Sequence, residues 1–534
     1  MSSTYDAVVI GAGPNGLVAA NHLVDHGWSV LVLEAQPDVG GAVASDRELH
    51  PEFVHDTFSA FYPLAAASPF IQDFGLDRHG LEWTHAPAVL GHCVPTGPRA
   101  SQQEGEWALL HRDREVTAAL MDAQHPGDGD AWLALCGEWD RIGDAVIGAL
   151  LTPFPPVRPG IAALAKLRSV GGLRFVRELL TPVADLGRHR FGGVAPRILL
   201  AGNAGHADIP LNAPGSGLMG IVMSMLGQTV GFPVPVGGAG VLAHALADRL
   251  RAAGADIRCD AEVTAIEVEG RRAVAVRTAD GERYAARHAV IADVAAPHLY
   301  GRLVPAAALP SRVVTAMRSF EMDPGTVKVD WALDGPVPWR VPPPHDPGTF
   351  HVADSVEQIA EAMHQVTSQT IPAEPFMLAG QMTTSDPTRS PAGTESMWAY
   401  THVPHDTVRD AGDGTVRGVW DEGDRERFAD RMQARIEALA PGFGSRVIAR
   451  RVLGPRELEA RDANLIGGGL NGGTAQLHQQ LVFRPMPGLG RAETPVRGLY
   501  LGSAAAHPGG GVHGAPGMNA ARAAIAHRRV RVLR

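Results

Sequence analysis

The chain opens with short apolar runs separated by one segment of helical periodicity. Ala7–Ile10 is a wholly apolar run, typical of a parallel strand buried on both faces. From Leu17 to about His26 the apolar residues recur at helical spacing, and a second apolar run spans Ser29 to Leu33. This order predicts a strand, a helix and a second parallel strand, which is the first unit of a Rossmann-type sheet.

The turn between the first strand and the helix has the spacing G-x-G-x-x-G, and an acid ends the second strand. Gly11 allows the tight turn, Gly13 lets the backbone approach a pyrophosphate, and Gly16 lets helix and strand pack closely. The helix N-terminus adds N–H groups and the positive end of its dipole. Glu34 stands where a carboxylate accepts hydrogen bonds from an adenosine ribose. The unit therefore predicts a dinucleotide site, without choosing between NAD and FAD.

The C-terminal end carries a second glycine-rich turn. Gly498–Gly502 predicts another buried strand; His507–Gly511 follows, and then Gly514–Arg522, which opens a helix. An ordinary surface loop is the alternative, but the segment leads into a helix N-terminus rather than joining two polar turns. If this turn also binds the cofactor, the cofactor is longer than a ligand that fills one mononucleotide-binding half of the sheet. Together with Gly40-Gly41, which comes soon after the ribose acid, this feature favours FAD.

Between the two ends, irregular helical segments alternate with regular strands. Residues from about 70 to 210 are rich in helical patterns and interrupted by prolines. The following part predicts a helix over 241–253 and strands at 256–259, 262–268, 273–278 and 287–292. Farther on, the pattern predicts strands at 326–333, 375–383 and 397–402 and a charged helix over 424–439. We expect the later strands to form an antiparallel sheet that covers the flavin, with helices behind it.

Composition and charge exclude several classes of function for this protein. The net charge of −10 at pH 7, without a basic stripe, argues against nucleic-acid binding. No apolar run reaches the ~18 residues that a bilayer span requires, and no secretory leader pattern precedes the first strand. Cys93, Cys136 and Cys259 form no C-x-x-C pair, which removes a dithiol reaction and fits a reducing compartment. We therefore expect a cytoplasmic protein without a metal site; its oligomeric state stays open.

One amphipathic stretch leaves membrane contact open. From Ile161 to Leu180 apolar residues recur at helical spacing, with Lys166, Arg168, Arg174 and Arg177 on other faces. Such a helix either lies on a membrane surface or packs against the core of the substrate domain. We expect the core-facing helix, and peripheral membrane contact is the alternative.

The segments Tyr5–Leu17, Glu34–Gly41 and His507–Asn519 resemble the phytoene desaturase-like FAD oxidoreductases, in particular their pyridine nucleotide-disulfide oxidoreductase domain-containing protein 2 branch. The resemblance covers nearly the whole chain and extends to the wider amine oxidase and glutathione reductase-type flavoproteins. It departs after the last strand, where relatives read Cys-Gly-Ser/Ala-Gly and this chain reads Gly502-Ser503-Ala504-Ala505-Ala506. Contacts near the flavin ring therefore differ from those of the relatives.

The resemblance implies an α/β fold in which a Rossmann-type FAD-binding domain combines with a discontinuous α+β substrate domain. The FAD-binding domain is expected at 1–65, 215–300 and 481–534, and the substrate-binding domain at 66–214 and 301–480. The residues expected to bind FAD are Gly11, Gly13, Pro14, Asn15, Gly16, Glu34, Ala35, Gly40, Gly41, Val263, Gly502, Gly510, Gly511, Gly517, Met518 and Asn519.

The expected reaction removes hydride from a carbon centre of an apolar or amphipathic small molecule, with C–C desaturation as the form implied by the resemblance. Oxygen or a quinone would reoxidise the flavin. Three residues are catalytic candidates. Lys328, one of only two lysines, lies on an alternating strand where related amine oxidases hold a water near the flavin; a solvent-facing lysine is the alternative. His507 and His513 flank the C-terminal turn and could relay protons, or could instead hold backbone carbonyls.

Three other functions stay open from the sequence. The first is oxidation of a C–N bond, as in amine oxidases, and the second is a flavin-dependent saturase or isomerase reaction. The third is a flavin-bearing interaction protein without turnover.

Overall fold

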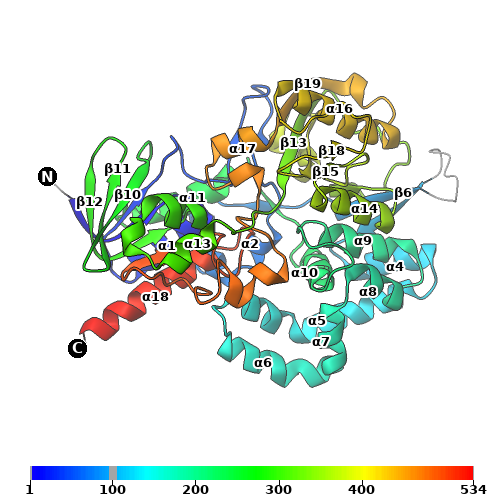
Figure 1. Ribbon diagram of the computed structural model, residues 1–534. Coiled ribbons are helices and arrows are strands. Elements are labelled where there is room, and N and C mark those ends of the chain that lie inside the picture. Colours follow the sequence, from blue (N-terminus) through cyan, green and yellow to red (C-terminus); the bar gives the residue numbers. More distant parts are fainter. Residues whose placement is uncertain (1–2, 96–104, 533–534) are drawn as a thin grey trace.

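Two seven-stranded sheets organise the protein (Figure 1). The computed structural model describes residues 3–95 and 105–532, so residues 1–2, 96–104 and 533–534 of the predicted domains lie outside the described part. The strands of the first sheet come from the front, the centre and the C-terminal end of the chain, and those of the second sheet come from the segments between them. The expected α/β fold with a Rossmann-type unit is confirmed.

The first sheet has a parallel core with an antiparallel extension. Its parallel strands are β1 (Ser3–Ile10), β2 (Val30–Leu33), β9 (Asp256–Arg258), β12 (Arg283–Ala292) and β20 (Leu499–Leu501). The antiparallel strands β10 (Val263–Glu269) and β11 (Arg272–Thr278) continue from β12. Helices α1 (Pro14–Asp25), α11 (Gly240–Ala252) and α18 (Ala515–Val532) share a buried apolar cluster with one face of this sheet. Alternate residues of β1 point to opposite faces, so both faces are covered.

The second sheet follows the order β19 (Val447–Leu453), β13 (Gly325–Leu333), β17 (Glu395–Val403), β16 (Met377–Gln381), β14 (Pro347–Val352), β6 (Ala88–Pro95) and β7 (Gly105–Leu110). Its strand pairs are antiparallel except β14 with β6, which is parallel. One face packs against α9 (Val194–Ala204) and α10 (Ser216–Thr229), and the other against α16 (Glu422–Leu439). The expected sheet with helices behind it is therefore present, with one parallel pair added.

Several strand and helix boundaries differ from the sequence prediction by a few residues. The strand expected over 375–383 is shorter, because Met382 begins the short helix α15 (Met382–Ser385). The expected domain boundary at residue 215 stays a prediction, although α10 packs within the helical cluster of α9 rather than on the first sheet. Other helices of this cluster are α4 (Arg114–Gln124), α5 (Asp128–Leu151), α8 (Val183–Arg190) and α14 (Val356–Thr367).

The single continuous helix expected over 161–180 is wrong, and only part of the segment faces the core. The segment forms α6 (Val157–Leu167), the short η2 (Arg168–Val170) and α7 (Leu173–Leu180), which protrude at one end of the molecule (Figure 1). Gly171 and Gly172 separate the helices with φ angles of 92° and 64°, a backbone region that glycine tolerates. No residue of α6 is buried, and α7 buries only Phe175. Among the described residues, no helix has both the length and the apolar character needed to cross a bilayer.

Candidate functional site

The front glycine turn forms where β1 ends and α1 begins. Gly11 has a φ of 92°, and its N–H donates to the Leu33 carbonyl at 2.8 Å. Gly13 caps α1, which starts at Pro14, and a Cβ on Gly16 would collide with the Gly11 carbonyl oxygen. The three glycines therefore have the roles that the motif predicts: a turn, an open helix N-terminus and close packing.

Asp293 lies behind this turn, at the carboxyl end of β12, and its backbone N–H donates to the Ile10 carbonyl. Its Oδ2 accepts a hydrogen bond from the Gly16 N–H at 2.8 Å, and a Cβ on Gly13 would lie 2.8 Å from the same oxygen. Burial raises the pKa of Asp293 to about 8, with a smaller contribution from the nearby Asp462 and Glu34 carboxylates. Sequence reasoning missed this residue. Its position directly after a predicted parallel strand was the available signal, because ligands bind at the carboxyl ends of such strands.

The adenosine end of the site is built around Glu34. Its Oε2 accepts from the Ala12 N–H at 2.6 Å and its Oε1 from the Gln36 N–H at 2.9 Å, while burial raises its pKa. Gly40 donates its N–H to the Ala12 carbonyl, so the Gly40-Gly41 turn packs on the front turn. A Cβ on Gly41 would lie only 3.3 Å from the Gly13 Cα.

Ala35 and Val263 lie at the same end as Glu34. The Ala261 N–H, two residues before Val263 at the start of β10, donates to the Glu34 carbonyl at 2.8 Å. Ala35 directly follows the acid in the chain. Both residues are therefore close to Glu34, and their contact with an adenine or ribose stays a prediction.

The C-terminal turn meets the front turn through helix packing. Gly502 donates its N–H to the Ala292 carbonyl at 2.9 Å, and α18 starts at Ala515. Gly517 packs directly on the backbone of Asn15, where a side chain would collide with the Asn15 carbonyl. The N-terminal ends of α1 and α18 are therefore in contact, and the positive ends of two helix dipoles meet at one place.

The residues present fit a flavin dinucleotide. The Oδ1 atoms of Asn15 and Asn519 are buried without a hydrogen-bond partner among the described residues. Met518 is buried beside them. Buried polar atoms normally have partners, so the side chains lack a polar group that a bound ligand can supply. Both atoms lie at helix N-termini, where a pyrophosphate binds well.

The two histidines of the C-terminal turn make different contacts. His513 Nδ1 accepts the Ala515 N–H at 3.1 Å and so caps α18, and burial lowers its pKa to about 4. His507 Nε2 donates to the Thr152 carbonyl at 3.0 Å, which leaves Nδ1 as the unprotonated nitrogen of the neutral ring. This Nδ1 is buried without a partner in the described structure, and burial lowers the pKa of His507.

Lys328 is buried, so the solvent-facing alternative is wrong. Its Nζ forms an ion pair with Asp330, two residues along the same strand. Asp330 also pairs with Arg451 at 2.8 Å, and Arg451 pairs with Asp46 at 2.7 Å. Burial lowers the pKa of Lys328 while Asp330 opposes this shift. The chain of charges joins the second sheet to the short hairpin of β3 (Ser45–Asp46) and β4 (His55–Asp56), which follows the Gly40-Gly41 turn.

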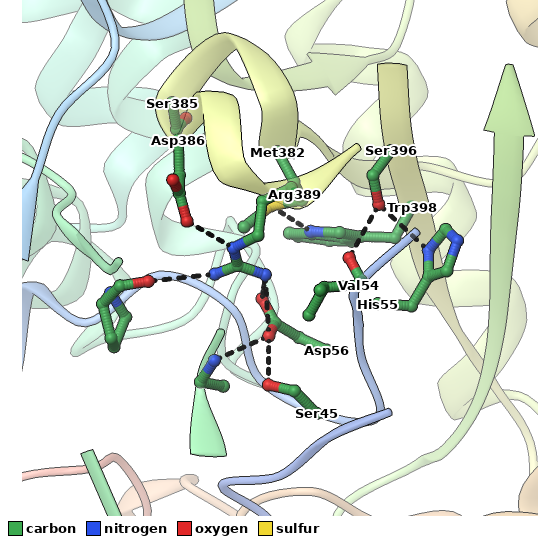
Figure 2. A network of polar contacts seen from close by, with 12 residues as sticks. Ser45, Val54, His55, Asp56, Met382, Ser385, Asp386, Arg389, Ser396 and Trp398 are labelled. Atoms are coloured by element: carbon green, nitrogen blue, oxygen red, sulfur yellow. Dashed lines mark hydrogen bonds and ion pairs between the residues drawn. The ribbon is translucent and has the colours of Figure 1, made fainter. Parts of the chain in front are cut away.

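A second buried network holds the same hairpin (Figure 2). Arg389 is fully buried and donates to both carboxylate oxygens of Asp56 at 3.0 Å and to Asp386 at 2.8 Å. Asp56 also accepts the Ala239 N–H, and Asp386 accepts the Gly237 N–H, both at 2.8 Å. The network thus joins the hairpin, the start of α11 and the segment between β16 and β17. Its members lie up to 333 residues apart, and no local pattern in the sequence indicates their pairing.

Arg484 holds the glycine-rich loop of residues 467–473 (the glycine loop), which lies beside the C-terminal turn. Its guanidinium is fully buried and donates to the carbonyls of Asn471 at 2.9 Å and Ala504 at 2.7 Å. From the other side, Asp323 accepts the Asn471 N–H at 2.8 Å. Asn471 in turn packs on Gly510, where a Cβ would lie 2.8 Å from the Asn471 Cα. Gly511 lies against His513. The loop is therefore a fixed wall of the C-terminal turn.

The cysteines take no part in this arrangement. Cys93, Cys136 and Cys259 are free thiols, and burial raises the pKa of Cys93 and Cys136 to about 11. Two inert thiols and one isolated thiol supply no redox dithiol.

Comparisons with known proteins agree with this arrangement. A family model described as NAD(P)-binding Rossmann-like domain matches residues 9–74, and one described as flavin containing amine oxidoreductase matches residues 167–385. Pyridine nucleotide-disulfide oxidoreductase domain-containing protein 2 of Mus musculus is 31% identical over 97% of this chain and 92% of its own length.

Two further similarities extend the comparison. The chloroplastic prolycopene isomerase of Daucus carota is 25% identical over 96% of this chain and 78% of its own length. The solved structure of putrescine oxidase bound to putrescine superposes with a TM-score of 0.58 at 16% identity, covering 99% of this chain and all of that chain. This structural likeness shows that the two chains share a fold.

Proposed function

The chain belongs to the family of pyridine nucleotide-disulfide oxidoreductase domain-containing protein 2, and from this premise we propose that it uses FAD to desaturate a carbon–carbon bond of an apolar or amphipathic small molecule. The protein is a flavin-containing oxidoreductase of the amine oxidase superfamily. FAD as the particular flavin is supported by the two contacting helix N-termini, because a dinucleotide has a pyrophosphate for them to hold.

The observation that carries the proposal is the contact between α1 and α18 at Asn15 and Gly517. This contact joins a dinucleotide turn to a second glycine turn whose neighbouring side chains are small, as Ala504, Ala505 and Ala506 follow β20. When bound, FAD supplies an acceptor for the hydride. The backbone N–H groups of both helix N-termini would hold its phosphates, and Glu34 would hold the ribose.

We propose His507 as the residue that takes the proton that leaves with the hydride. Its Nε2–H is fixed by the Thr152 carbonyl, so Nδ1 carries the free lone pair. Desaturation removes a hydride from one carbon and a proton from its neighbour, and the two C–H electron pairs become the hydride and the new π bond. The neutral imidazole accepts the proton at Nδ1. His513 is occupied as a helix cap, so we assign it a structural role.

The relatives' names support an apolar substrate but also a second candidate. Prolycopene isomerase is named for a polyene hydrocarbon, which favours an apolar molecule here. The match to the flavin containing amine oxidoreductase family favours oxidation of a C–N bond as the alternative reaction. The electron acceptor that we propose is oxygen or a quinone.

A spectrum of the purified protein and chromatography of the heat-released cofactor form the first test. We expect a flavin absorption spectrum and released FAD. Gly13→Asp should abolish FAD retention because its added carboxylate meets Asp293, whereas Gly301→Ala, with open space around the site of substitution, should retain it. A folded Gly13→Asp protein with full FAD content would contradict the assigned site.

The reaction is tested by anaerobic bleaching of the bound flavin. We expect a polyene hydrocarbon dispersed in detergent to reduce the flavin, and putrescine to leave it oxidised. Reduction by putrescine and other amines alone would replace desaturation with C–N oxidation. A flavin that no substrate class bleaches, but that dithionite reduces, would favour a protein without turnover.

A further inference from the structure

The helices α6 and α7 expose aliphatic side chains that a soluble surface rarely groups together. Val157, Ile161 and Leu164 recur along α6 at spacings of four and three, so they share one face. Leu164 is 69% exposed and Leu173, at the start of α7, is 80% exposed. Large aliphatic side chains that gather on one exposed surface mark an interaction site.

These exposed residues are distinct from the ones that anchor the segment. Val170 and Phe175 are buried with Ile142 of α5, and Leu167 and Leu179 pack beside them. The segment therefore already has an inner apolar set that holds it to the protein. The outer set has no role in that packing, so its exposure needs another explanation.

The same segment is basic within an acidic protein. Between residues 157 and 177 the chain has five Arg or Lys residues and no Asp or Glu, while the whole chain has a net charge of −10. The basic residues are all exposed: Arg158, Lys166, Arg168, Arg174 and Arg177. Glu178, the first acid after them, pairs with Arg174 and Arg190. A basic surface with exposed aliphatic side chains is complementary to anionic lipid headgroups over an acyl layer.

A neighbouring loop extends the exposed apolar surface. Leu477, Leu481, Val482 and Phe483 are all at least 36% exposed. Leu477 lies against Gly215, and Gly217 packs on the Thr181 carbonyl just after α7. The loop also leads directly into Arg484, the clamp of the glycine loop.

The segment is joined to the flavin site at its other end. The Thr152 carbonyl accepts from His507, and the Leu151 carbonyl accepts from Asn519 at 3.2 Å. Only four residues separate Thr152 from the start of α6. A surface that contacts lipid at α6 would therefore be close in sequence to residues that contact the proposed FAD site.

We propose that α6, η2 and α7 form a peripheral membrane surface that lies on an anionic lipid bilayer. The basic side chains contact the headgroups, and the exposed aliphatic side chains enter the headgroup and acyl boundary. A second copy of this chain is a less favourable partner for this surface, because a two-fold interface would place the basic segments of both copies against each other. The proposal does not depend on the reaction that the flavin performs.

Cosedimentation of the purified flavoprotein with vesicles tests this surface. The vesicles are phosphatidylcholine alone or equal parts of phosphatidylcholine and phosphatidylglycerol. We expect binding to the anionic vesicles that weakens with added salt and is lost at least about tenfold on Ile161→Glu/Leu164→Glu/Leu173→Glu. The pair Lys166→Gln/Arg168→Gln should weaken it by roughly fivefold per residue. Val408→Glu, at an aliphatic residue 72% exposed elsewhere, is the matched control and should bind like the parent.

Several results would overturn the proposal. These are an unmodified protein that ignores anionic vesicles, a triple variant that binds as well as the parent, or a control that loses as much as the triple variant. A concentration-dependent dimer that the triple variant abolishes, without vesicle binding, would assign the face to a second copy. Flavin content is measured in every sample, so a failure of the flavin site is visible separately.

Discussion

Replacing Asp293 with asparagine should make the protein more stable at neutral and alkaline pH. Burial raises the pKa of Asp293 from 3.8 to about 8 in the folded state. The unfolded chain therefore loses this proton near pH 3.8, while the folded protein keeps it until about pH 8. Across that window the folded state binds more protons, so the free energy of unfolding falls as pH rises. The side chain thus costs stability at the pH where the protein works.

The size of this stability loss follows from the pKa shift of Asp293. Each pKa unit corresponds to about 1.4 kcal/mol, so the loss accumulates to about 4 kcal/mol at pH 7 and about 6 kcal/mol above pH 8. Asparagine has no such proton, and its side-chain oxygen can still accept the Gly16 N–H. The difference in unfolding free energy between Asp293→Asn and the parent should therefore change by several kcal/mol between pH 4 and pH 8.

Urea unfolding of both flavin-free proteins at a series of pH values measures this difference. The exposed Asp406→Asn serves as the control and should follow the parent at every pH. Retention of FAD gives a second readout, because a negative pyrophosphate favours the neutral carboxyl. We expect FAD retention by the parent to weaken above pH 8 and that of Asp293→Asn to stay level. A stability difference independent of pH would refute the assignment of a protonated carboxyl behind the glycine turn.

Three further substitutions test the networks around the site. Arg389→Met leaves Asp56 as a buried, unpaired charge, and urea unfolding should show a loss of about 3–5 kcal/mol; a loss below about 1 kcal/mol would contradict the pairing. Lys328→Met should slow anaerobic flavin reduction at least about tenfold with FAD content unchanged, if its ammonium also holds a water; an unchanged rate would limit Lys328 to the ion network. His507→Gln should slow reduction about 10²–10⁴-fold, measured by stopped flow. Because burial lowers the pKa of His507, the parent's rate should stay level as pH falls through 6.5, and a decline centred there would count against the neutral base.

The backbone elements of the cofactor site could be predicted from sequence because their signals are local. The glycine spacing, the two apolar runs and the acid all lie within 34 residues, and the observed α1 and β2 follow them closely. The turn at the C-terminal end was predictable for the same reason. The segment 161–180 was not, because helical periodicity shows that an apolar face exists but not which side the protein covers.

Lys328 shows how far a rare residue type can guide interpretation. In a chain with two lysines, its retention on an alternating strand singled it out, and its burial excludes the solvent-facing alternative; its role beside the flavin stays a prediction. Its partner Asp330 lay two residues away and was visible in the sequence. Arg451 and Asp46, which complete the network, come from distant segments that only the fold brings together.

Some residues of the site could not be predicted from the sequence because of the way in which proteins bind a dinucleotide. Backbone N–H groups make the contacts, so the sequence marks the site with glycines, whose side chains carry no chemistry. The position of that backbone is then fixed by buried polar side chains in a second layer: Asp293 behind α1, Arg389 behind the hairpin and Arg484 behind the glycine loop. The two buried guanidinium charges would be costly alone and are offset by carboxylates and backbone carbonyls, whereas Asp293 stays neutral and accepts the Gly16 N–H. Motifs therefore identify where the cofactor binds, whereas these second-layer residues become visible only once the chain is folded.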